Sequence, residues 1–444
     1  MSTRAMLSPQ RRAEVLDALR RGTVPATGLD VLAVGLDRFE PTIREELQQV
    51  KVGRGLFKAV RGEYGTGKTF FARWLQELAL RQGFAVAEVQ VSEVDTPLHK
   101  LEAIYRRLIE RLSTADTRGG ALRSVVDGWF YALEEEVIAS GVTGPTDEAR
   151  LVEETTALME KRLAAVTRHA PAFAACLRGY RRALVAGESD VAEGLLAWLG
   201  GSPTVSASIK RHAGLKGELD HVGAMAFVQG LLVMLRDAGQ AGLVLVLDEV
   251  ETVQRVRGDV RGRALNALRQ LMDEVDAGRY PGLYLLITGT PSFYDGHQGV
   301  QRLQPLAQRL HVEFTPDARF DNPRHVQIRL SNFDLARLEE VGRHVRDLFA
   351  DGANDPGRIR TVVDDAYVAN LAQAVTGGLG GKVGVAPRIY LKKLVGEVLD
   401  RVDQFPEFDP RRDYALTITD SELTAAEREA RPAADVDDVE LTLD

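Results

Sequence analysis

The hydrophobic positions along this chain alternate between short apolar runs and longer stretches with helical spacing. Runs of strand length occur at Leu56–Val60, Ala85–Val91, Leu243–Glu249 and Leu283–Pro291. The last two begin with continuous apolar residues and end in polar ones, and a continuous apolar run is typical of a strand buried on both faces. Such strands belong to parallel sheets, so the pattern predicts an α/β fold with a parallel sheet flanked by helices.

Helical spacing fills most of the remaining chain. It predicts a helix over Ser8–Arg21, another through Ile43, Leu47 and Val50, and a third over Leu98–Leu112. From Ser113 to about residue 216 the pattern is helical, which indicates a helical subdomain inserted into the core. The predicted order is an N-terminal helix (1–30), the first part of the core (31–112), a helical insertion (113–216), the second part of the core (217–330), a helical lid (331–402) and an acidic tail (403–444).

A complete phosphate-binding loop, Gly-Glu-Tyr-Gly-Thr-Gly-Lys-Thr, occupies residues 62–69. A predicted strand precedes it and a predicted helix follows it, which is the context that such a loop requires. The pattern predicts a nucleoside triphosphate bound with magnesium, with Lys68 at the β and γ phosphates and the Thr69 hydroxyl on the metal. The predicted nucleotide-binding residues are Gly62, Glu63, Tyr64, Gly65, Thr66, Gly67, Lys68, Thr69 and Phe70.

Two acidic residues end the third predicted strand, where ligands of parallel sheets bind. Asp248 is placed to hold magnesium through its water shell, and Glu249 to orient and deprotonate an attacking water. This pair favours hydrolysis over phosphoryl transfer. Thr290, with Thr288 as second choice, ends the next strand, where a hydroxyl can help to hold the water. Capping of the following turn is an equally weighted alternative for either threonine.

Arginines that can reach the γ-phosphate follow later in the chain. Gln301–Phe314 is predicted to be a helix leading into another strand, with Arg309 at the helix end. In an oligomeric ATPase an arginine there can reach the nucleotide of the neighbouring subunit. Arg302 is the fallback, and a surface salt bridge is an equally weighted alternative for both. Arg388, in a helix that begins with a proline, can fold back over the phosphates from the lid.

Composition and charge narrow the function classes. The chain of 444 residues has 45% apolar residues, one cysteine and scattered histidines, so it offers no internal disulfide, multi-cysteine metal site or histidine metal motif. Cys176 is expected to be a packed apolar side chain. The net charge is -8, but residues 403–444 contain 13 acids and 4 arginines, which leaves the preceding body at +1. A body of this charge can carry a basic face. No apolar run spans a bilayer and no signal peptide is evident, so the protein is expected to be cytoplasmic.

The order of phosphate loop, Asp-Glu strand end, polar strand end, helix-terminal arginine and Pro-Arg lid helix resembles the AAA+ ATPases over roughly residues 30–400. Val34–Arg38 and Ile287–Pro291 resemble the origin-recognition and transposition-helper branches, whose members work on DNA. Three longer segments resemble the ATP-binding D protein of BREX phage-defence systems more closely, and the helical insertion fits that family too. These segments are Ala33–Phe39, Arg61–Phe71 and Leu247–Thr252.

This resemblance implies a bacterial cytoplasmic ATPase that binds ATP and Mg2+ and acts with other defence components, including a helicase, to exclude phage DNA. A homo-oligomer is expected as well, in which Arg309 would reach the nucleotide of a neighbouring subunit. Origin-recognition relatives usually continue into a winged helix after the lid, and no such module is evident here, so any DNA contact is expected from the core, the insertion or the N-terminal segment. The basic clusters of the insertion are Arg178–Arg182 and Lys210–His212, for which solvated helix faces are the alternative.

Two functions from different classes therefore remain open. The first is a DNA-associated ATPase switch or motor that hydrolyses ATP with Glu249. The second is a nucleotide-gated scaffold that binds ATP with little turnover and recruits partners through the insertion and the acidic tail. A kinase is a weaker reading because the Asp-Glu strand end favours hydrolysis, and a nuclease is weaker still.

Overall fold

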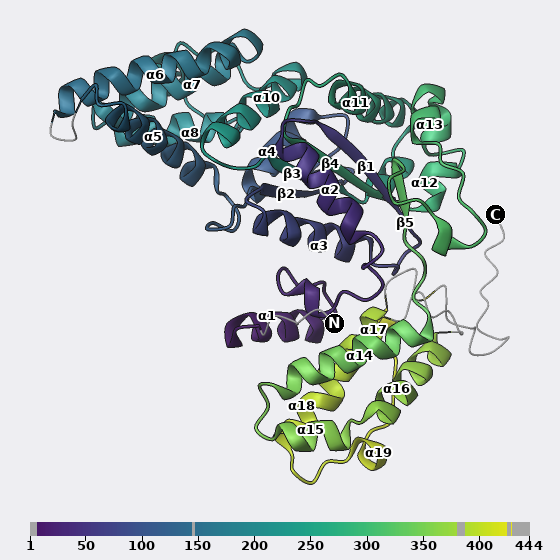
Figure 1. The fold of residues 1–444 in the computed structure, drawn as a ribbon. Coiled ribbons are helices and arrows are strands. Elements are labelled where there is room, and N and C mark those ends of the chain that lie inside the picture. Colours follow the sequence, from purple (N-terminus) through teal and green to yellow (C-terminus); the bar gives the residue numbers. More distant parts are fainter. Residues whose placement is uncertain (1–6, 144–146, 380–386, 424–427, 429–444) are drawn as a thin grey trace.

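A computed structural model of the chain describes residues 7–143, 147–379, 387–423 and 428. Its centre is a sheet of five parallel strands in the order β2-β3-β4-β1-β5 (Figure 1). The sheet confirms the predicted α/β class. The strands are β1 Leu56–Arg61, β2 Ala85–Gln90, β3 Leu243–Asp248, β4 Leu283–Gly289 and β5 Gln327–Arg329.

The first four strands lie where the apolar runs predicted them, and β3 and β4 are buried along their whole length. The prediction for the fifth strand was wrong in position. Helix α13 (Gln304–Leu310) is followed by irregular structure, and β5 begins only at Gln327. There it pairs with β1, with Ala59 opposite Gln327. Because all strands are parallel, their carboxyl ends share one edge of the sheet.

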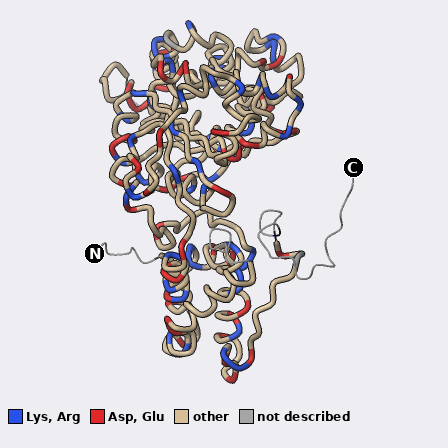
Figure 2. Tube along the Cα trace, turned by 90° about the vertical axis from the view of Figure 1, so that its right-hand side faces the viewer, with Lys and Arg blue, Asp and Glu red and all other residues tan. Residues whose placement is uncertain are grey.

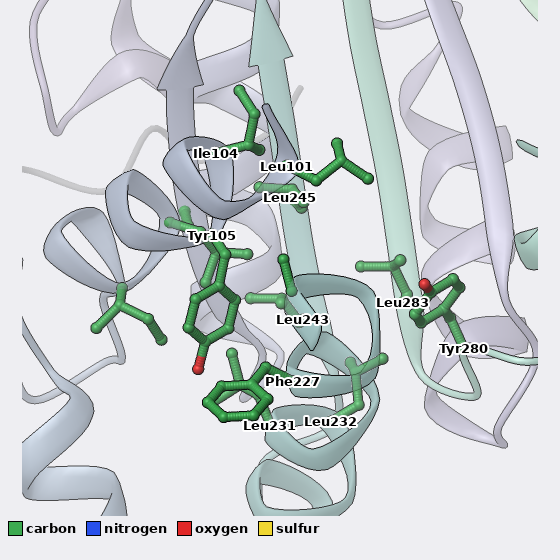
Figure 3. Packing of buried hydrophobic residues seen from close by; sticks show 14 of the residues in the cluster. Leu101, Ile104, Tyr105, Phe227, Leu231, Leu232, Leu243, Leu245, Tyr280 and Leu283 are labelled. Atoms are coloured by element: carbon green, nitrogen blue, oxygen red, sulfur yellow. The ribbon is translucent and has the colours of Figure 1, made fainter. Parts of the chain in front are cut away.

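Helices cover both faces of the sheet (Figure 1). On one face, an apolar cluster joins helices α2 and α3 to Val60, Val244 and Leu286. On the other face, Tyr105 of α4 and Phe227 of α10 meet edge to face, 5.6 Å between ring centroids, close to Leu243 and Leu245 of β3 (Figure 3). The covering helices are α2 Glu40–Lys51, α3 Lys68–Arg81, α4 Leu101–Arg111, α10 His221–Asp237 and α11 Gly258–Asp276.

The segment predicted as an insertion forms a helical layer that extends away from the sheet (Figure 1). It shares the apolar cluster of the second sheet face, and the Trp129 indole donates a hydrogen bond to Asp237 of α10 at 2.6 Å. Cys176 is buried in this layer, and burial raises the pKa of its thiol. The helices are α5 Leu122–Ala139, α6 Glu148–His169, α7 Pro171–Val185, α8 Ser189–Leu199 and α9 Ala207–His212.

A second helical lobe follows the sheet and includes the N-terminal helix (Figure 1). Val15 and Leu19 of α1 belong to its apolar cluster, and so does Leu423, the last residue of the continuous described segment. The packed lobe therefore extends to residue 423, beyond the predicted lid boundary at 402, and the rest of the predicted tail lies outside the described residues apart from residue 428. The elements are α1 Pro9–Arg20, α14 Leu335–Ala350, α15 Pro356–Val362, α16 Asp365–Gly378, α17 Pro387–Lys392, the π-helical segment Lys393–Leu399, α18 Asp400–Gln404 and α19 Pro410–Asp413.

Within the described ranges, no helix combines the length and the apolar character that crossing a membrane requires.

Candidate nucleotide-binding site

The phosphate-binding loop connects β1 to α3 at the carboxyl edge of the sheet. Gly65 and Gly67 have φ values of 83° and 90°, a left-handed conformation that favours glycine. Gly62 is close to Thr66, whose hydroxyl a Cβ at residue 62 would overlap. The glycines thus allow a tight loop whose backbone can approach phosphate groups, and α3 starts at Lys68 with its N-terminus at the loop.

Lys68 is buried, and its ammonium group is satisfied by the loop itself. Its Nζ donates to the Gly62 carbonyl at 2.9 Å and to the Glu63 carbonyl at 3.2 Å. It also lies 5.1 Å from the centroid of the Tyr64 ring. Burial lowers the pKa of Lys68, against the opposing effect of nearby carboxylates, Glu251 first among them. To reach a phosphate, Lys68 must exchange its carbonyl partners for phosphate oxygens.

Asp248, at the end of β3, is held by two hydroxyl groups. Thr69 donates to Oδ2 at 2.9 Å, and Thr288 of β4 donates to Oδ1. The Thr288 hydroxyl also accepts from the Glu249 backbone N–H at 3.1 Å. Burial raises the pKa of Asp248, and the two hydroxyl bonds oppose that effect. The structure thus brings Thr69 and Asp248, the predicted metal ligands, into direct contact.

Glu249 has φ 59° and is the one non-glycine residue with positive φ within the described ranges. A left-handed conformation costs a non-glycine residue about 1–2 kcal/mol, and such strain clusters at functional sites. Its carboxylate Oε2 accepts a hydrogen bond from Nε2 of Gln90 at 2.8 Å. Gln90 ends β2, which lies on the side of β3 away from the phosphate loop. The carboxylate is therefore held toward the outer strand.

Two residues of this site escaped the sequence reasoning, Gln90 and Glu251. Glu251 is only 4% exposed, and neither of its carboxylate oxygens has a hydrogen-bond partner among the residues that the structure describes. It lines the same cavity as Lys68. Burial raises its pKa, and the positive charge of Lys68 opposes that effect. A second acidic residue after the Asp-Glu pair was a usable signal for Glu251, whereas nothing near Gln90 in the sequence marks it.

The two candidate threonines occupy different places. Thr288 is fully buried between Asp248 and Glu249, whereas the Thr290 hydroxyl pairs with that of Ser292 at 2.9 Å. Thr290 stands at the N-cap of the short helix α12 (Pro291–Asp295), although its side chain makes no capping bond. Thr288, the second choice, is therefore the threonine that contacts Asp248 and Glu249.

The arginines predicted near the γ-phosphate have protein partners. Arg309 forms a salt bridge with Asp273 of α11 at 2.7 Å and lines a hollow beside Leu56, the first residue of β1. This position is at the opposite end of the strands from the phosphate loop. Arg302 donates to Gln298 at 3.3 Å. Arg388 lines the nucleotide cavity and donates to the main-chain oxygen of Glu422.

A cavity of about 320 Å³ extends from the phosphate loop between the core and the lid. This volume falls within the usual range of small-molecule sites. Its apolar walls come from the N-terminal segment, the turn before α2 and the lid, and it also contains Arg38 and Arg337. The apolar walls include Leu19, Val24, Leu32, Val34, Leu36, Phe39, Phe70, Val341 and Leu391. Apolar walls of this kind suit the flat face of a nucleotide base.

The residues fit a nucleotide with magnesium. A hydroxyl and a carboxylate, both oxygen donors, meet at Thr69 and Asp248, as hard cations require. Magnesium usually takes one or two carboxylate groups and completes its shell with water and phosphate oxygens. Among the residues that the structure describes, no group of three or more His, Cys, Asp or Glu is arranged to hold a metal.

The basic clusters of the insertion are largely paired within the chain. Arg178 binds Glu160 at 2.7 Å and Arg181 binds Glu134 at 2.6 Å. Arg182 donates to the main-chain oxygen of His212 at 2.9 Å. Their charges are thus used to hold the helices together.

Comparison with known families agrees with this site. The family model described as BREX system ATP-binding protein BrxC/D matches residues 7–418. The chain belongs to this family. The match confirms the resemblance to a BREX ATP-binding protein, and ATP is the ligand that the family description implies. No curated protein and no solved structure matches the chain.

Proposed function

We propose that this BREX family member is a magnesium-dependent ATPase of the AAA+ type that acts as a switch or motor on DNA in phage defence. The observation that carries the proposal is the chain of contacts from Thr69 through Asp248 to Thr288, with Glu249 next to it. These groups meet beside the phosphate loop, and each has the chemical character that γ-phosphate hydrolysis requires. Binding of ATP alone does not require hydroxyl and carboxylate groups that contact one another in this way.

Each residue has a distinct task in this proposal. Loop backbone groups and Lys68 hold the β and γ phosphates, and the apolar cavity holds the base. When bound, magnesium neutralises phosphate charge, and Thr69 and Asp248 are the residues that would hold it. Glu249 takes the proton of the attacking water once its carboxylate leaves Gln90. In a homo-oligomer, Arg309 would exchange Asp273 for the nucleotide of a neighbouring subunit.

The test is ATP turnover by the purified full chain, with and without single- and double-stranded DNA. Lys68→Ala should lose ATP binding, because the ammonium group is the main cationic contact of the phosphates. Glu249→Gln should bind ATP and lose turnover by about 100-fold or more, since general-base catalysis contributes about 10²–10⁴-fold. Steady-state hydrolysis by Glu249→Gln at the wild-type rate would refute the role of Glu249.

A second candidate function, a nucleotide-gated scaffold with little turnover, draws support from one observation. Glu249 is tied to Gln90 and Lys68 to loop carbonyls, an arrangement in which hydrolysis is not ready to proceed. The scaffold would capture defence partners, including a helicase, only when ATP is bound. Tight ATP binding without turnover, with and without DNA, would favour it.

A further inference from the structure

An unusual concentration of arginines lies where the 3-10 helix η2 (Val250–Arg255) passes into α11. Between residues 252 and 268 the chain has four arginines and a single acidic residue, Asp259. Along the backbone trace, Lys and Arg segments are interspersed with Asp and Glu segments in both lobes (Figure 2). The arginine-rich junction plays no part in the nucleotide site described above.

One of these arginines fixes the backbone, and the others point outward. Arg261 donates to the main-chain oxygens of Gln254 at 2.9 Å and Val256 at 2.8 Å, and so holds the end of η2 in place. The side chain of Arg257 is 86% exposed and that of Arg263 is 60% exposed. Arg255 is exposed as well. The turn thus displays three guanidinium groups to solvent on a fixed backbone.

The intramolecular acids near these arginines balance only part of their charge. Arg257 and Arg263 share Asp259, at 3.4 Å and 3.6 Å, which are long distances for ion pairs. Arg302 joins the group because it donates to Gln298, which also accepts from Arg261. We call Arg255, Arg257, Arg263 and Arg302 the arginine patch.

The positive charge of the patch is felt at His99, in the neighbouring loop between β2 and α4. Burial, together with the positive charges of Arg263 and Lys100, lowers the pKa of His99. The opposing acids at His99 are Glu102 and Asp259. Arg257 and Arg263 share the single acid Asp259, so an external polyanion would stabilise this surface. Guanidinium groups match the geometry of phosphate in particular.

We propose that the arginine patch binds the phosphate backbone of DNA beside the nucleotide site. This proposal rests on the DNA association of the proposed function and gives it a location. It replaces the insertion clusters, in which Arg178, Arg181 and Arg182 are paired with acids or a carbonyl, as the main contact surface. Sequence-independent phosphate contact is the expected mode, because exposed arginine side chains that are not held in one orientation can reach phosphates but do not present a fixed pattern to base edges.

The patch has a short physical connection to Glu249. Glu249 is the N-cap of η2, and Arg255 is the last residue of that helix. Thr252 ties the helix down by donating to the Glu249 carbonyl at 3.0 Å and to the Val91 carbonyl at 3.3 Å. A shift of η2 on DNA binding would therefore move Glu249 relative to Gln90, so DNA should raise ATP turnover through this helix.

The test compares DNA binding by the full-length wild-type chain with that of Arg255→Ala/Arg257→Ala/Arg263→Ala. A matched control, Arg319→Ala/Arg324→Ala/Arg412→Ala, removes the same charge from three other exposed arginines, each paired with a carboxylate. A third variant with lysine at the three patch positions keeps the charge. Fluorescence anisotropy with labelled duplex and single-stranded DNA over a salt series gives affinity and salt slope, and binding of a fluorescent ATP analogue verifies that each variant is folded.

Each phosphate contact contributes about 0.9 to the slope of log affinity against log salt on duplex DNA. The alanine patch variant should therefore lose up to about 3 in slope and on the order of a hundred-fold in affinity at ~0.1 M salt. The lysine variant should retain most of both, and the control should match the wild type.

Three results would overturn the proposal: no binding of DNA by the wild type at low salt, unchanged binding by the alanine patch variant, or equal losses in patch and control variants. Unchanged binding would leave an acidic protein segment as the ligand class for these arginines. Basal ATP turnover is measured in the same preparations. Its absence would count against the hydrolysis proposal, whereas the patch is judged by DNA affinity and salt slope alone.

Discussion

The position of Thr288 allows a quantitative test of which threonine, Thr288 or Thr290, holds Asp248 and Glu249 in place. Thr288→Val keeps the shape of a fully buried side chain and removes its hydroxyl. Asp248 then loses one of its two hydroxyl donors, and the Glu249 backbone N–H loses its acceptor. A hydrogen bond to a charged group contributes about 1.5–3 kcal/mol, and a buried unsatisfied N–H costs about 1–3 kcal/mol. The expected loss of core stability is about 3–5 kcal/mol.

Thr290→Val is the matched control, because Thr290 is also buried and lies two residues further along, directly after β4. It loses one hydroxyl pair with Ser292, a loss of about 1 kcal/mol. The difference between the two variants should therefore be about 3 kcal/mol. A cooperative unit of about 150–250 residues loses roughly 2–4 °C in melting temperature per kcal/mol, so Thr288→Val should melt roughly 6–12 °C below Thr290→Val.

Differential scanning calorimetry of the nucleotide-free chains in a chelator measures this difference, and ATP turnover is measured on the same samples. Thr288→Ser keeps the hydroxyl and should recover most of the stability and of the turnover. The reasoning is refuted if Thr290→Val is destabilised as much as Thr288→Val, or if Thr288→Ser is no better than Thr288→Val.

Two further predictions concern the residues that sequence reasoning missed. Gln90→Leu removes the bond that holds Glu249 toward β2, a bond of about 1 kcal/mol, so basal ATP turnover should rise about three- to ten-fold; a fall in turnover with ATP affinity unchanged would contradict this. Glu251→Gln replaces a buried acid whose folded pKa is raised by burial. Because such an acid binds its proton more tightly when folded, it lowers stability as pH rises from about 4.5 through the folded pKa. The glutamine variant should melt higher than the wild type at pH 7 without nucleotide, with the gap closing toward pH 4.5, and a variant that melts lower at pH 7 would show that the Lys68 attraction outweighs burial.

The sequence predicted those parts of the fold whose signals are local. The apolar runs of β3 and β4 are buried on both faces, and the glycine spacing of the phosphate loop depends on neighbouring residues alone. The last strand was misplaced because β5 has three residues, Gln327–Arg329, and only one of them is aliphatic. A strand that short is defined by its pairing with β1 and not by its own pattern.

The contacts that the sequence did not predict depend on strand order and backbone conformation. Gln90 reaches Glu249 because β2 lies beside β3, and residues 159 positions apart then share one edge of the sheet. Glu251 faces Lys68 because η2 starts from the left-handed backbone of Glu249 and turns the next side chains inward. Neither the order of strands nor a left-handed non-glycine residue can be read from hydrophobic spacing.

Under the proposed function, ATP binding and ATP hydrolysis would be controlled by different contacts of the site. Lys68 is held by loop carbonyls and Arg388 by the Glu422 carbonyl, and phosphate oxygens can replace both sets of partners directly because both residues line the cavity. Glu249 also lines the cavity, but its partner Gln90 belongs to β2, on the side of β3 away from the phosphate loop. We expect nucleotide binding alone to leave that hydrogen bond in place. Movement of β2 or of η2 would release it, and η2 ends at Arg255 of the arginine patch.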